Sequence, residues 1–384
     1  MAPVVDGYPR PDRDRLADLF LTLAAEASPS RRERGVADLV SGRLRALGLH
    51  VHEDETGVAI GGDTGNLYCP VGDGDPTLMM AAHMDTVVPQ GPLEPYLEDG
   101  IFRNRRDTIL GGDDKAAVAA MLHATELLVE AGIPFPSYEL CFTVAEEVGL
   151  LGAKHFVTDE IRSPLGAVFD SSGPVGGITV HAPTQETIHA TFQGKAAHAG
   201  LEPETGRSAI VGAARAIAAM ELGRLDEDTT ANVGIIEGGS AINIVPERCV
   251  VRAECRSLDQ AKLAGVLAAM VDALQRGATE AGVDVDINLV HEYAGFKLSG
   301  RSSIVRLSKA AVTAAGLRPA LVTSGGGSDA NVFNVRGIPT VNFDCGMTAV
   351  HTAEESLELE DLVRLCRVVL AMIALAPGYG RSRR

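Results

Sequence analysis

The chain has 384 residues, 46% of them apolar, which is enough for one large domain or two ordinary domains with a sizeable core. It carries 51 acidic against 34 basic residues, a formal net charge of −17. So acidic a surface disfavours binding to nucleic acid or to anionic membranes, and no run of about 18 apolar residues predicts a transmembrane helix.

The first residues contain no apolar stretch typical of a signal peptide. The six cysteines form no CxxC pair, and several lie in apolar runs, which favours buried thiols over a disulfide framework. We therefore expect a reducing, cytoplasmic location.

The first part of the chain alternates helices and strands. The predicted helices are 12–47, 115–131 and 148–157, and the predicted strands are 77–82, 138–145 and 165–170. This alternation predicts an α/β fold with a mainly parallel mixed sheet and helices on both faces.

A second region follows a different pattern. Its predicted strands are 186–193, 232–237, 249–256 and 284–292, and its predicted helices are 207–222 and 259–281. The order β-α-β-β-α-β is typical of a ferredoxin-like α+β unit. The first pattern then resumes with a helix at 302–315, a strand at 338–344 and a helix at 358–375. We therefore predict a catalytic domain of residues 1–183 and 294–384, interrupted by an inserted domain of residues 184–293.

Five side chains that can bind metal follow successive apolar runs. They are His83, Asp113, Glu147, Asp170 and His351. Open α/β sheets place their sites at the carboxyl ends of parallel strands, and two imidazoles with three carboxylates suit a pair of Zn²⁺-like ions. Individually these residues have ordinary alternatives, since Asp170 is typical of a turn and an isolated loop histidine usually has no special role.

Two acidic pairs sharpen the prediction. Asp113-Asp114 precedes a helix, where one Asp suffices as an N-cap and the other can bridge two cations. Glu146-Glu147 follows an apolar strand, where two ionised carboxylates repel each other unless a cation is near. One of them can bind metal while the other acts as a general base, although a solvated acidic turn at a helix start is the alternative. Asp85, two residues after His83, can accept the free ring N–H of that imidazole.

With these residues assembled, the chain resembles the M20 family of co-catalytic zinc peptidases and amidohydrolases, in particular its peptidase T-like branch. The resemblance covers nearly the whole chain. The motifs that carry it, in the family's order, are AAHMDTV, LGGDDKAA, TVAEEVGLLGA, GKAAHAG, GGSAINIVPE, SGGGSDANVF and the final His351.

The resemblance implies a role for each residue of the set. One divalent ion, most simply Zn although Co or Mn fits the same ligands, would be held by His83, Asp113 and Asp170. A second would be held by Asp113, Glu147 and His351. Asp85 would orient His83, and Glu146 would activate a water that bridges the ions. The inserted domain resembles the family's lid, which often also carries the contact of a homodimer.

The resemblance also implies substrate-binding residues. His198, in GKAAHAG, would stabilise the oxyanion, and Asn243 and Arg256 would contact substrate from the lid. Backbone N–H groups at Gly326, Gly327 and Ser328 open an expected helix and could hold a substrate carboxylate or carbonyl. The alternatives are a turn histidine without a partner and an ordinary glycine turn.

The predicted activity is hydrolysis of amide bonds in small peptides, as in a tripeptide aminopeptidase. Two alternatives stay open: an M20 deacylase or carboxypeptidase acting on N-acyl amino acids or other small amides, and, more distantly, a non-catalytic protein that binds ligand with metal. The chain departs from peptidase T after Asp170, where SSGPVGGITVHAPTQ replaces an acidic segment with Asn-Phe-Asn.

Overall fold

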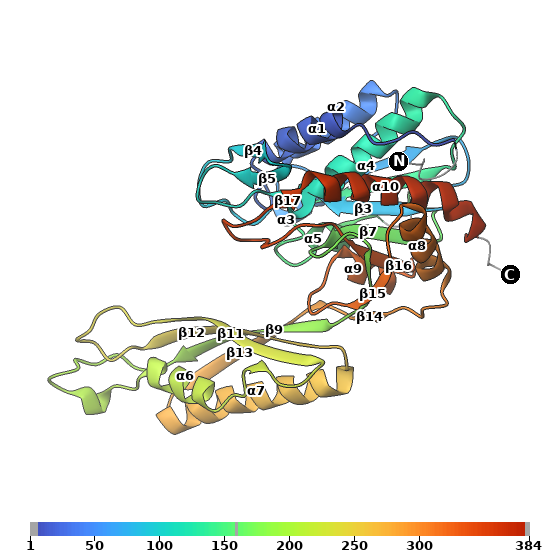
Figure 1. The fold of residues 1–384 in the computed structure, drawn as a ribbon. Coiled ribbons are helices and arrows are strands. Elements are labelled where there is room, and N and C mark those ends of the chain that lie inside the picture. Colours follow the sequence, from blue (N-terminus) through green and yellow to red (C-terminus); the bar gives the residue numbers. More distant parts are fainter. Residues whose placement is uncertain (1–6, 158–159, 381–384) are drawn as a thin grey trace. The chain divides into compact units, whose positions relative to one another are not determined.

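A computed structural model describes residues 7–157 and 160–380 of the chain. The chain divides into two compact units (Figure 1). Unit 1 comprises Met1–His181, Lys297–Ser324 and Ser328–Arg384, and unit 2 comprises Ala182–Phe296 and Gly325–Gly327. The assignment of these parts to a catalytic domain and a lid stays a prediction.

The larger sheet has nine strands among the described residues, in the order β1-β2-β6-β3-β7-β16-β8-β14, with β15 paired to β8. Its strands are β1 (His52–Glu53), β2 (Leu67–Val71), β3 (Met79–His83), β6 (Tyr138–Thr143), β7 (Gly166–Ser171), β8 (Gly177–Ala182), β14 (Phe296–Lys297), β15 (Ala320–Thr323) and β16 (Thr340–Asp344). The central strands β6, β3, β7 and β16 run parallel. Strand β2 is antiparallel to β6, and β8 is antiparallel to β16 but parallel to β15. The predicted mixed, mainly parallel sheet is therefore confirmed.

The central strands are buried at every position of β3 and β6, as expected where helices cover both faces of a parallel sheet. In their register His83 lies opposite Thr143, and β7 lies on the other side of β3. The carboxyl ends of β3, β6 and β7 consequently meet at one edge of the sheet. That edge receives His83, the segment after Thr143, and Asp170.

Helices flank this sheet (Figure 1). They are α1 (Arg13–Ala25), α2 (Arg34–Ala46), α3 (Thr56–Ile60), α4 (Gly112–Ala131), α5 (Leu151–His155), α8 (Ser303–Ala314), α9 (Asp329–Val335) and α10 (Leu359–Leu375). One buried apolar cluster joins helices and sheet, with Phe169 stacked on Phe343 at 4.9 Å between ring centroids. A small sheet of β4 (Pro95–Glu98), β5 (Ile101–Asn104) and β17 (Leu357–Glu358), which the sequence pattern does not predict, lies beside it.

The helical spacing over residues 12–47 corresponds to two helices, α1 and α2, with a break between them. The chain leaves helical geometry between Ala25 and Arg34, because Pro29 lies in the middle of the segment and cannot continue a helix. Pro29 instead forms a bridge with Thr86, and the Ser28 hydroxyl donates to the carbonyl of Met84 at 2.9 Å. The break therefore brings the segment 26–33 against the end of β3.

Unit 2 has the order predicted from the sequence. Its elements are β9 (Thr184–Gln193), α6 (Ala209–Ala218), β10 (Gly223–Arg224), β11 (Thr229–Gly238), β12 (Arg248–Ser257), α7 (Gln260–Ala281) and β13 (Asp284–Tyr293). The strands form an antiparallel sheet in the order β10-β11-β12-β9-β13, which contains the ferredoxin-like arrangement. Helices α6 and α7 pack closely where Gly277 faces Gly212. A Cβ at Gly277 would lie 2.6 Å from the carbonyl oxygen of Gly212, so the absence of a side chain permits this approach. The ferredoxin-like prediction is therefore confirmed.

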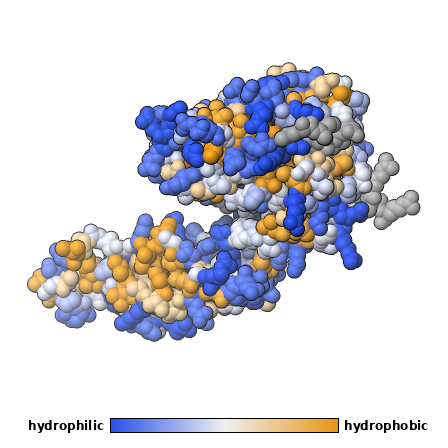
Figure 2. All heavy atoms as spheres, viewed as in Figure 1, coloured by the Kyte–Doolittle hydropathy of each residue, from blue (hydrophilic) through white to orange (hydrophobic). Residues whose placement is uncertain are grey.

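Unit 2 also exposes large apolar side chains. They include Ile210, Val211, Ile235, Ile236, Ile242 and Leu289. Figure 2 shows apolar residues gathered on this unit. None of the helices in the described residues is long and apolar enough to cross a membrane. All six cysteines are buried and free of disulfides.

Candidate metal centre

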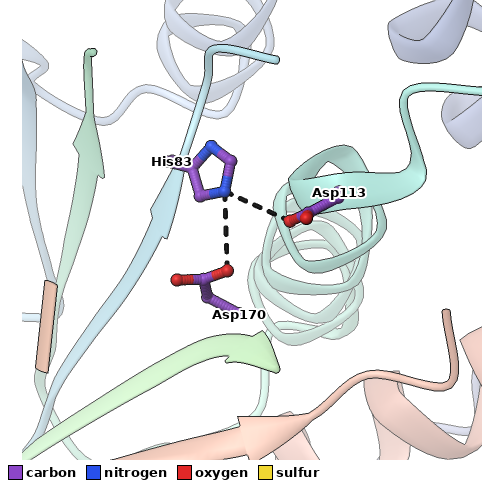
Figure 3. A group of neighbouring side chains, drawn as sticks. All are labelled: His83, Asp113 and Asp170. Atoms are coloured by element: carbon purple, nitrogen blue, oxygen red, sulfur yellow. Dashed lines mark hydrogen bonds and ion pairs between the residues drawn. The ribbon is translucent and has the colours of Figure 1, made fainter. Parts of the chain in front are cut away.

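Three of the predicted ligands form a first group at the edge of the large sheet (Figure 3). His83 ends β3, Asp113 lies in the first turn of α4, and Asp170 lies near the end of β7. The Nε2 atom of His83 is 3.3 Å from Asp113 Oδ1 and 3.5 Å from Asp170 Oδ1. These side chains are 2%, 14% and 9% exposed, so the group is nearly closed to solvent. We call it the inner group.

A second group shares Asp113 with the first. The Nε2 atom of His351 is 2.9 Å from Glu147 Oε1 and 3.2 Å from Asp113 Oδ2. The two oxygens of Asp113 thus face different histidines, which is the arrangement expected of a bridging carboxylate. In each group one candidate ligand atom per residue lies within 4.8 Å of the others. We call Asp113, Glu147 and His351 the outer group, because the His351 side chain is 46% exposed.

The electrostatics of the groups fit divalent cations. Burial, followed by the charge of Asp170, raises the pKa of Glu146 well above its ordinary value. Burial also raises the pKa of Asp170 to about 7. Hydrogen bonds with Asp113 and then Glu147 raise the pKa of His351 to about 10. Several carboxylates are therefore crowded in a place with little water, and imidazole nitrogen with carboxylate oxygen is a donor set that Zn²⁺ prefers. The residues present fit a pair of such ions.

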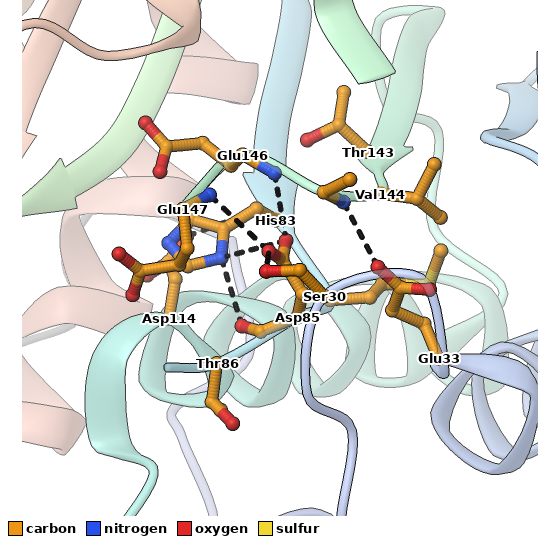
Figure 4. A network of polar contacts seen from close by, with 12 residues as sticks. Ser30, Glu33, His83, Asp85, Thr86, Asp114, Thr143, Val144, Glu146 and Glu147 are labelled. Carbon is orange, nitrogen blue, oxygen red and sulfur yellow. Dashed lines mark hydrogen bonds and ion pairs between the residues drawn. The ribbon is translucent and has the colours of Figure 1, made fainter. Parts of the chain in front are cut away.

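Asp85 contacts the Nδ1 atom of His83 through two oxygens, and the main-chain one is the nearer. The Nδ1–H of His83 donates to the backbone carbonyl of Asp85 at 2.9 Å, whereas the Asp85 carboxylate lies 3.5 Å from Nδ1 (Figure 4). The carboxylate is engaged elsewhere. It accepts the backbone N–H of Glu146 at 3.0 Å, that of Glu147 at 3.2 Å and the hydroxyl of Ser30 at 2.7 Å. Asp85 still fixes the tautomer of His83, but it does so through its main chain, and its side chain holds the Glu146-Glu147 segment.

Glu146 belongs to neither group among the described residues. Its backbone N–H points to Asp85, while its carboxylate extends away from Asp85 (Figure 4). The preceding residue, Ala145, has a left-handed φ of +51° and donates its N–H to Glu33 at 2.9 Å. Burial and then the charge of Asp85 raise the pKa of Glu33 to about 7. The turn that carries Glu146 is thus held by two buried carboxylates, and the Glu146 side chain stays available for another role.

Asp114 supports the inner group. Its side chain is buried and accepts the backbone N–H of His83 at 3.2 Å. Lys115, also buried, donates to the carbonyl of Glu26 at 2.5 Å, and burial lowers its pKa to about 8. Both residues therefore hold the ends of neighbouring elements together.

Two buried acids near the site escaped the sequence analysis. Asp329 accepts the hydroxyl of Thr143 at 2.5 Å, and burial raises its pKa to about 6. Glu355 accepts the backbone N–H groups of Leu110, Gly111 and Asp113. The only local signal for Glu355 was a second Glu-Glu pair, Glu354-Glu355, shortly after His351. That pair lies in a polar loop and has no apolar run before it.

Two of the predicted substrate contacts of unit 2 lie on adjoining loops. The residue after His198, Ala199, donates its N–H to the carbonyl of Asn243 at 2.9 Å, and both side-chain positions are exposed. The Nδ1 atom of His198 accepts the N–H groups of Gly200 and Leu201, each at 3.1 Å. A neutral His198 must therefore carry its proton on Nε2. Arg256 lies on β12 and is paired with Glu254 at 2.6 Å.

Packing and helix capping explain Gly327 and Ser328 of the segment Gly326-Gly327-Ser328 without a substrate. A Cβ at Gly327 would lie 2.3 Å from the ring of Tyr293, so only glycine fits there. Ser328 is the N-cap of α9 and accepts the N–H of Ala330 at 3.3 Å. The helix start is thus already capped by its own side chain, and substrate binding by Gly326, Gly327 and Ser328 stays a prediction.

Two family descriptions of peptidases match parts of the chain. Residues 68–199, which contain His83, Asp113, Glu147 and Asp170, match the family description "Peptidase family M28". Residues 186–282, which lie in unit 2, match "Peptidase dimerisation domain".

Full-length relatives extend the likeness over the whole chain. It is similar to the aminopeptidase PepT structure from Bacillus cereus, with 40% identity, a TM-score of 0.83, and coverage of 96% of this chain and 99% of that one. It is also similar to a tripeptidase structure from Staphylococcus aureus, with 36% identity, a TM-score of 0.89, and coverage of 97% and 100%. The YqjE protein of Bacillus subtilis is 40% identical over 94% of this chain and 97% of its own length. The chain is therefore a metal-dependent hydrolase and belongs to the M20 family of metallopeptidases, in its peptidase T-like branch.

Proposed function

We propose that this chain is a two-metal exopeptidase that removes the N-terminal residue from tripeptides and similarly small peptides. The observation that carries the proposal is the pair of ligand groups sharing Asp113, with Glu146 next to them and outside both. The tripeptidase and aminopeptidase names of the similar structures support the choice of substrate.

In this proposal the inner group holds one divalent ion and the outer group holds the other, with Zn the favoured metal and Co or Mn compatible with the same ligands. When bound, such a pair stabilises negative charge on an amide oxygen and makes water a better nucleophile near neutral pH. The tautomer of His83 suits this role, because its Nδ1–H is occupied by Asp85 and its Nε2 lone pair faces Asp113 and Asp170.

Glu146 is the proposed general base. Burial and then the carboxylate charge of Asp170 raise the pKa of Glu146. The ionised carboxylate would therefore be a stronger base than an ordinary glutamate. It would take a proton from the attacking water and later give it to the leaving amine. Its position is set by Asp85, which holds the backbone N–H groups of Glu146 and Glu147. Asp85 therefore positions both the proposed proton acceptor, Glu146, and one ligand of the outer group, Glu147.

Unit 2 would supply further contacts with substrate. Because the Nδ1 atom of His198 already accepts two backbone N–H groups, the Nε2–H remains as a donor for the developing oxyanion. Asn243, on the adjoining loop, would bind the substrate backbone, and Arg256 on β12 would bind a substrate carboxylate.

We further propose a homodimer formed through unit 2. The match to a peptidase dimerisation domain and the exposed apolar side chains of Ile210, Ile236 and Leu289 support it. The six buried, free cysteines support a reducing compartment such as the cytoplasm.

The substrate assignment is tested with metal-loaded protein and four substrate types: free tripeptides, dipeptides, N-acetylated tripeptides and N-acyl amino acids. We expect turnover of tripeptides with release of the N-terminal residue, and a large loss on N-acetylation. Preferential hydrolysis of N-acyl amino acids would instead assign a deacylase. Protein that binds metal but hydrolyses none of these substrates would contradict the peptidase proposal.

A further inference from the structure

A buried carboxylate, that of Glu355, is enclosed by main-chain donors just before α4 and in its first turn. Its Oε2 accepts the N–H groups of Leu110 and Gly111, each at 2.8 Å, and its Oε1 accepts the N–H of Asp113 at 3.1 Å. The residue is 2% exposed. Hydrogen bonds to a charged acceptor in a dry environment are roughly twice as strong as neutral ones, so this loop is tightly held.

The backbone of the loop is shaped to fit around that carboxylate. Gly111 has a φ of +74°, a left-handed conformation that favours glycine. A Cβ at Gly112 would lie 3.1 Å from Glu355 Oε1, closer than ordinary contact allows without a shift. Successive N–H groups converging on one anion in this way form a nest, a concave anion site made from main chain. Here the anion is part of the protein, and the residue that ends the nest is Asp113.

The same carboxylate is tied to His351. Both lie in a loop whose ends are closed by hydrogen bonds between Thr348 and Ser356, at 3.0 and 3.1 Å, and the Glu355 N–H donates to the carbonyl of Thr352 at 3.2 Å. His351 itself has a left-handed φ of +66° and a half-exposed ring that contacts Asp113 and Glu147. Glu355 thus joins the loop of one outer ligand to the loop of another.

We propose that Glu355 is a positioning residue that sets the affinity of the outer group for its ion by fixing Asp113 relative to His351. The inference rests on the two-ion function proposed above. The inner group depends less on this link, because His83 and Asp170 are placed by the paired strands β3 and β7. Glu147 is held separately, by Asp85.

The chain offers a matched control in Glu139. Its buried carboxylate also accepts two backbone N–H groups, those of Arg162 and Ser163 at 2.9 Å, and the hydroxyl of Tyr68 at 2.6 Å. It lies at the start of β6, whereas the ligand-bearing edge of the sheet is at the ends of the strands. Both carboxylates are buried and accept backbone N–H groups, but only Glu355 holds a segment that carries a predicted metal ligand.

The test is a titration of metal-free protein with Co²⁺, followed by the visible absorption of the bound ion, for wild type, Glu355→Gln and Glu139→Gln. Glutamine keeps the size of the side chain but places an NH₂ group against backbone donors. We expect wild type to bind Co²⁺ in two steps. Glu355→Gln should weaken the second step by roughly 10–100-fold, as outer-shell changes do, while the first step changes much less. Glu139→Gln should lower stability and leave both steps unchanged.

Two further readouts separate positioning from general damage. In metal-free Glu355→Gln the amides of Leu110 and Gly111 should exchange with deuterium faster than in wild type. With tripeptide substrate, excess Co²⁺ should restore kcat of Glu355→Gln without changing KM. The inference is overturned if Glu355→Gln titrates like wild type, or if Glu139→Gln shifts the second step equally. A wild type that binds a single ion would overturn the two-ion function as well.

Discussion

The two ligand groups differ in how the fold builds them. In the inner group, His83 and Asp170 come from adjacent parallel strands, and their side chains are 2% and 9% exposed. In the outer group, Glu147 lies in a turn closed by hydrogen bonds to the carbonyl of Glu146, and His351 lies in a loop with a side chain that is 46% exposed. Both use the same Asp113. Strand pairing positions the inner group, whereas hydrogen bonds to the side chains of Asp85 and Glu355 position the outer group.

On the two-ion proposal, this contrast predicts that the inner group binds its ion more tightly than the outer group. The strand ends are already in place before an ion arrives, so little ordering entropy has to be lost there. The outer ligands depend on loops that must be held together. The predictions below test that contrast, beginning with the largest expected effect.

Replacing Glu146 by Gln should lower kcat by about 10²–10⁴-fold, because the side chain can no longer accept a proton. Both ions should stay bound, since Glu146 lies outside both groups among the described residues. The measurement is steady-state hydrolysis of a tripeptide together with metal content by emission spectroscopy. Near-wild-type turnover would refute the role of Glu146 as general base. Loss of an ion would show that Glu146 is itself a metal ligand.

His83→Ala and His351→Ala should each weaken a different binding step by more than the roughly 10–100-fold typical of outer-shell changes, because each removes a direct ligand. We expect His83→Ala to remove the tighter step and His351→Ala the weaker one. Calorimetric titration of metal-free protein with Zn²⁺ measures both. If His351→Ala removed the tighter step, the ranking of the groups would be reversed.

Asp85→Asn should weaken the outer group and lower kcat by about tenfold or more, within the range for outer-shell residues. Asparagine places an NH₂ group where the carboxylate accepts the N–H groups of Glu146 and Glu147. The inner group should bind almost normally, because His83 donates to the main-chain carbonyl of Asp85. Equal weakening of both steps in the same titration would show that the carboxylate acts on His83 after all.

The smallest effect concerns pH in the metal-free protein. Hydrogen bonds with Asp113 and then Glu147 raise the pKa of His351 from 6.5 to about 10. Protonated His351 therefore stabilises the folded state fully below pH 6.5, and this contribution is lost as the pH rises through about 10. The ring is half-exposed, so we expect less than about 1 kcal/mol. Urea unfolding of wild type and His351→Ala in EDTA should differ more at pH 6 than at pH 10.5.

The sequence predicted the parts of the site that local patterns encode. Apolar runs placed His83 and Asp170 at strand ends, and the acidic pairs identified Asp113 and Glu147 as candidates. The alternation of elements and the ferredoxin-like insertion also followed from periodicity. These features depend on residues close together in the chain, which is why one sequence suffices to predict them.

Contacts between distant loops could not be predicted in this way. Glu355 holds amides about 240 residues earlier in the chain, and Asp85 holds amides about 60 residues later. Nothing in the polar segment around Glu355 indicates that its carboxylate is buried. The break at Pro29 differs, because the proline that ends the helix is visible in the sequence and only the bridge that places its segment, to Thr86, is not.

That segment has a consequence for anyone shortening the protein. The stretch from Ser28 to Glu33 supplies Ser30 to Asp85 and Glu33 to Ala145, so it forms the floor beneath the turn that bears Glu146. A variant that lacks α1 and this stretch would keep every ligand and the base. It would lose the hydrogen bonds of Ser30 and Glu33 that hold Asp85 and Ala145 in place. Tags and fusions are therefore better joined ahead of Asp12, where α1 is capped, than placed anywhere in the first connection.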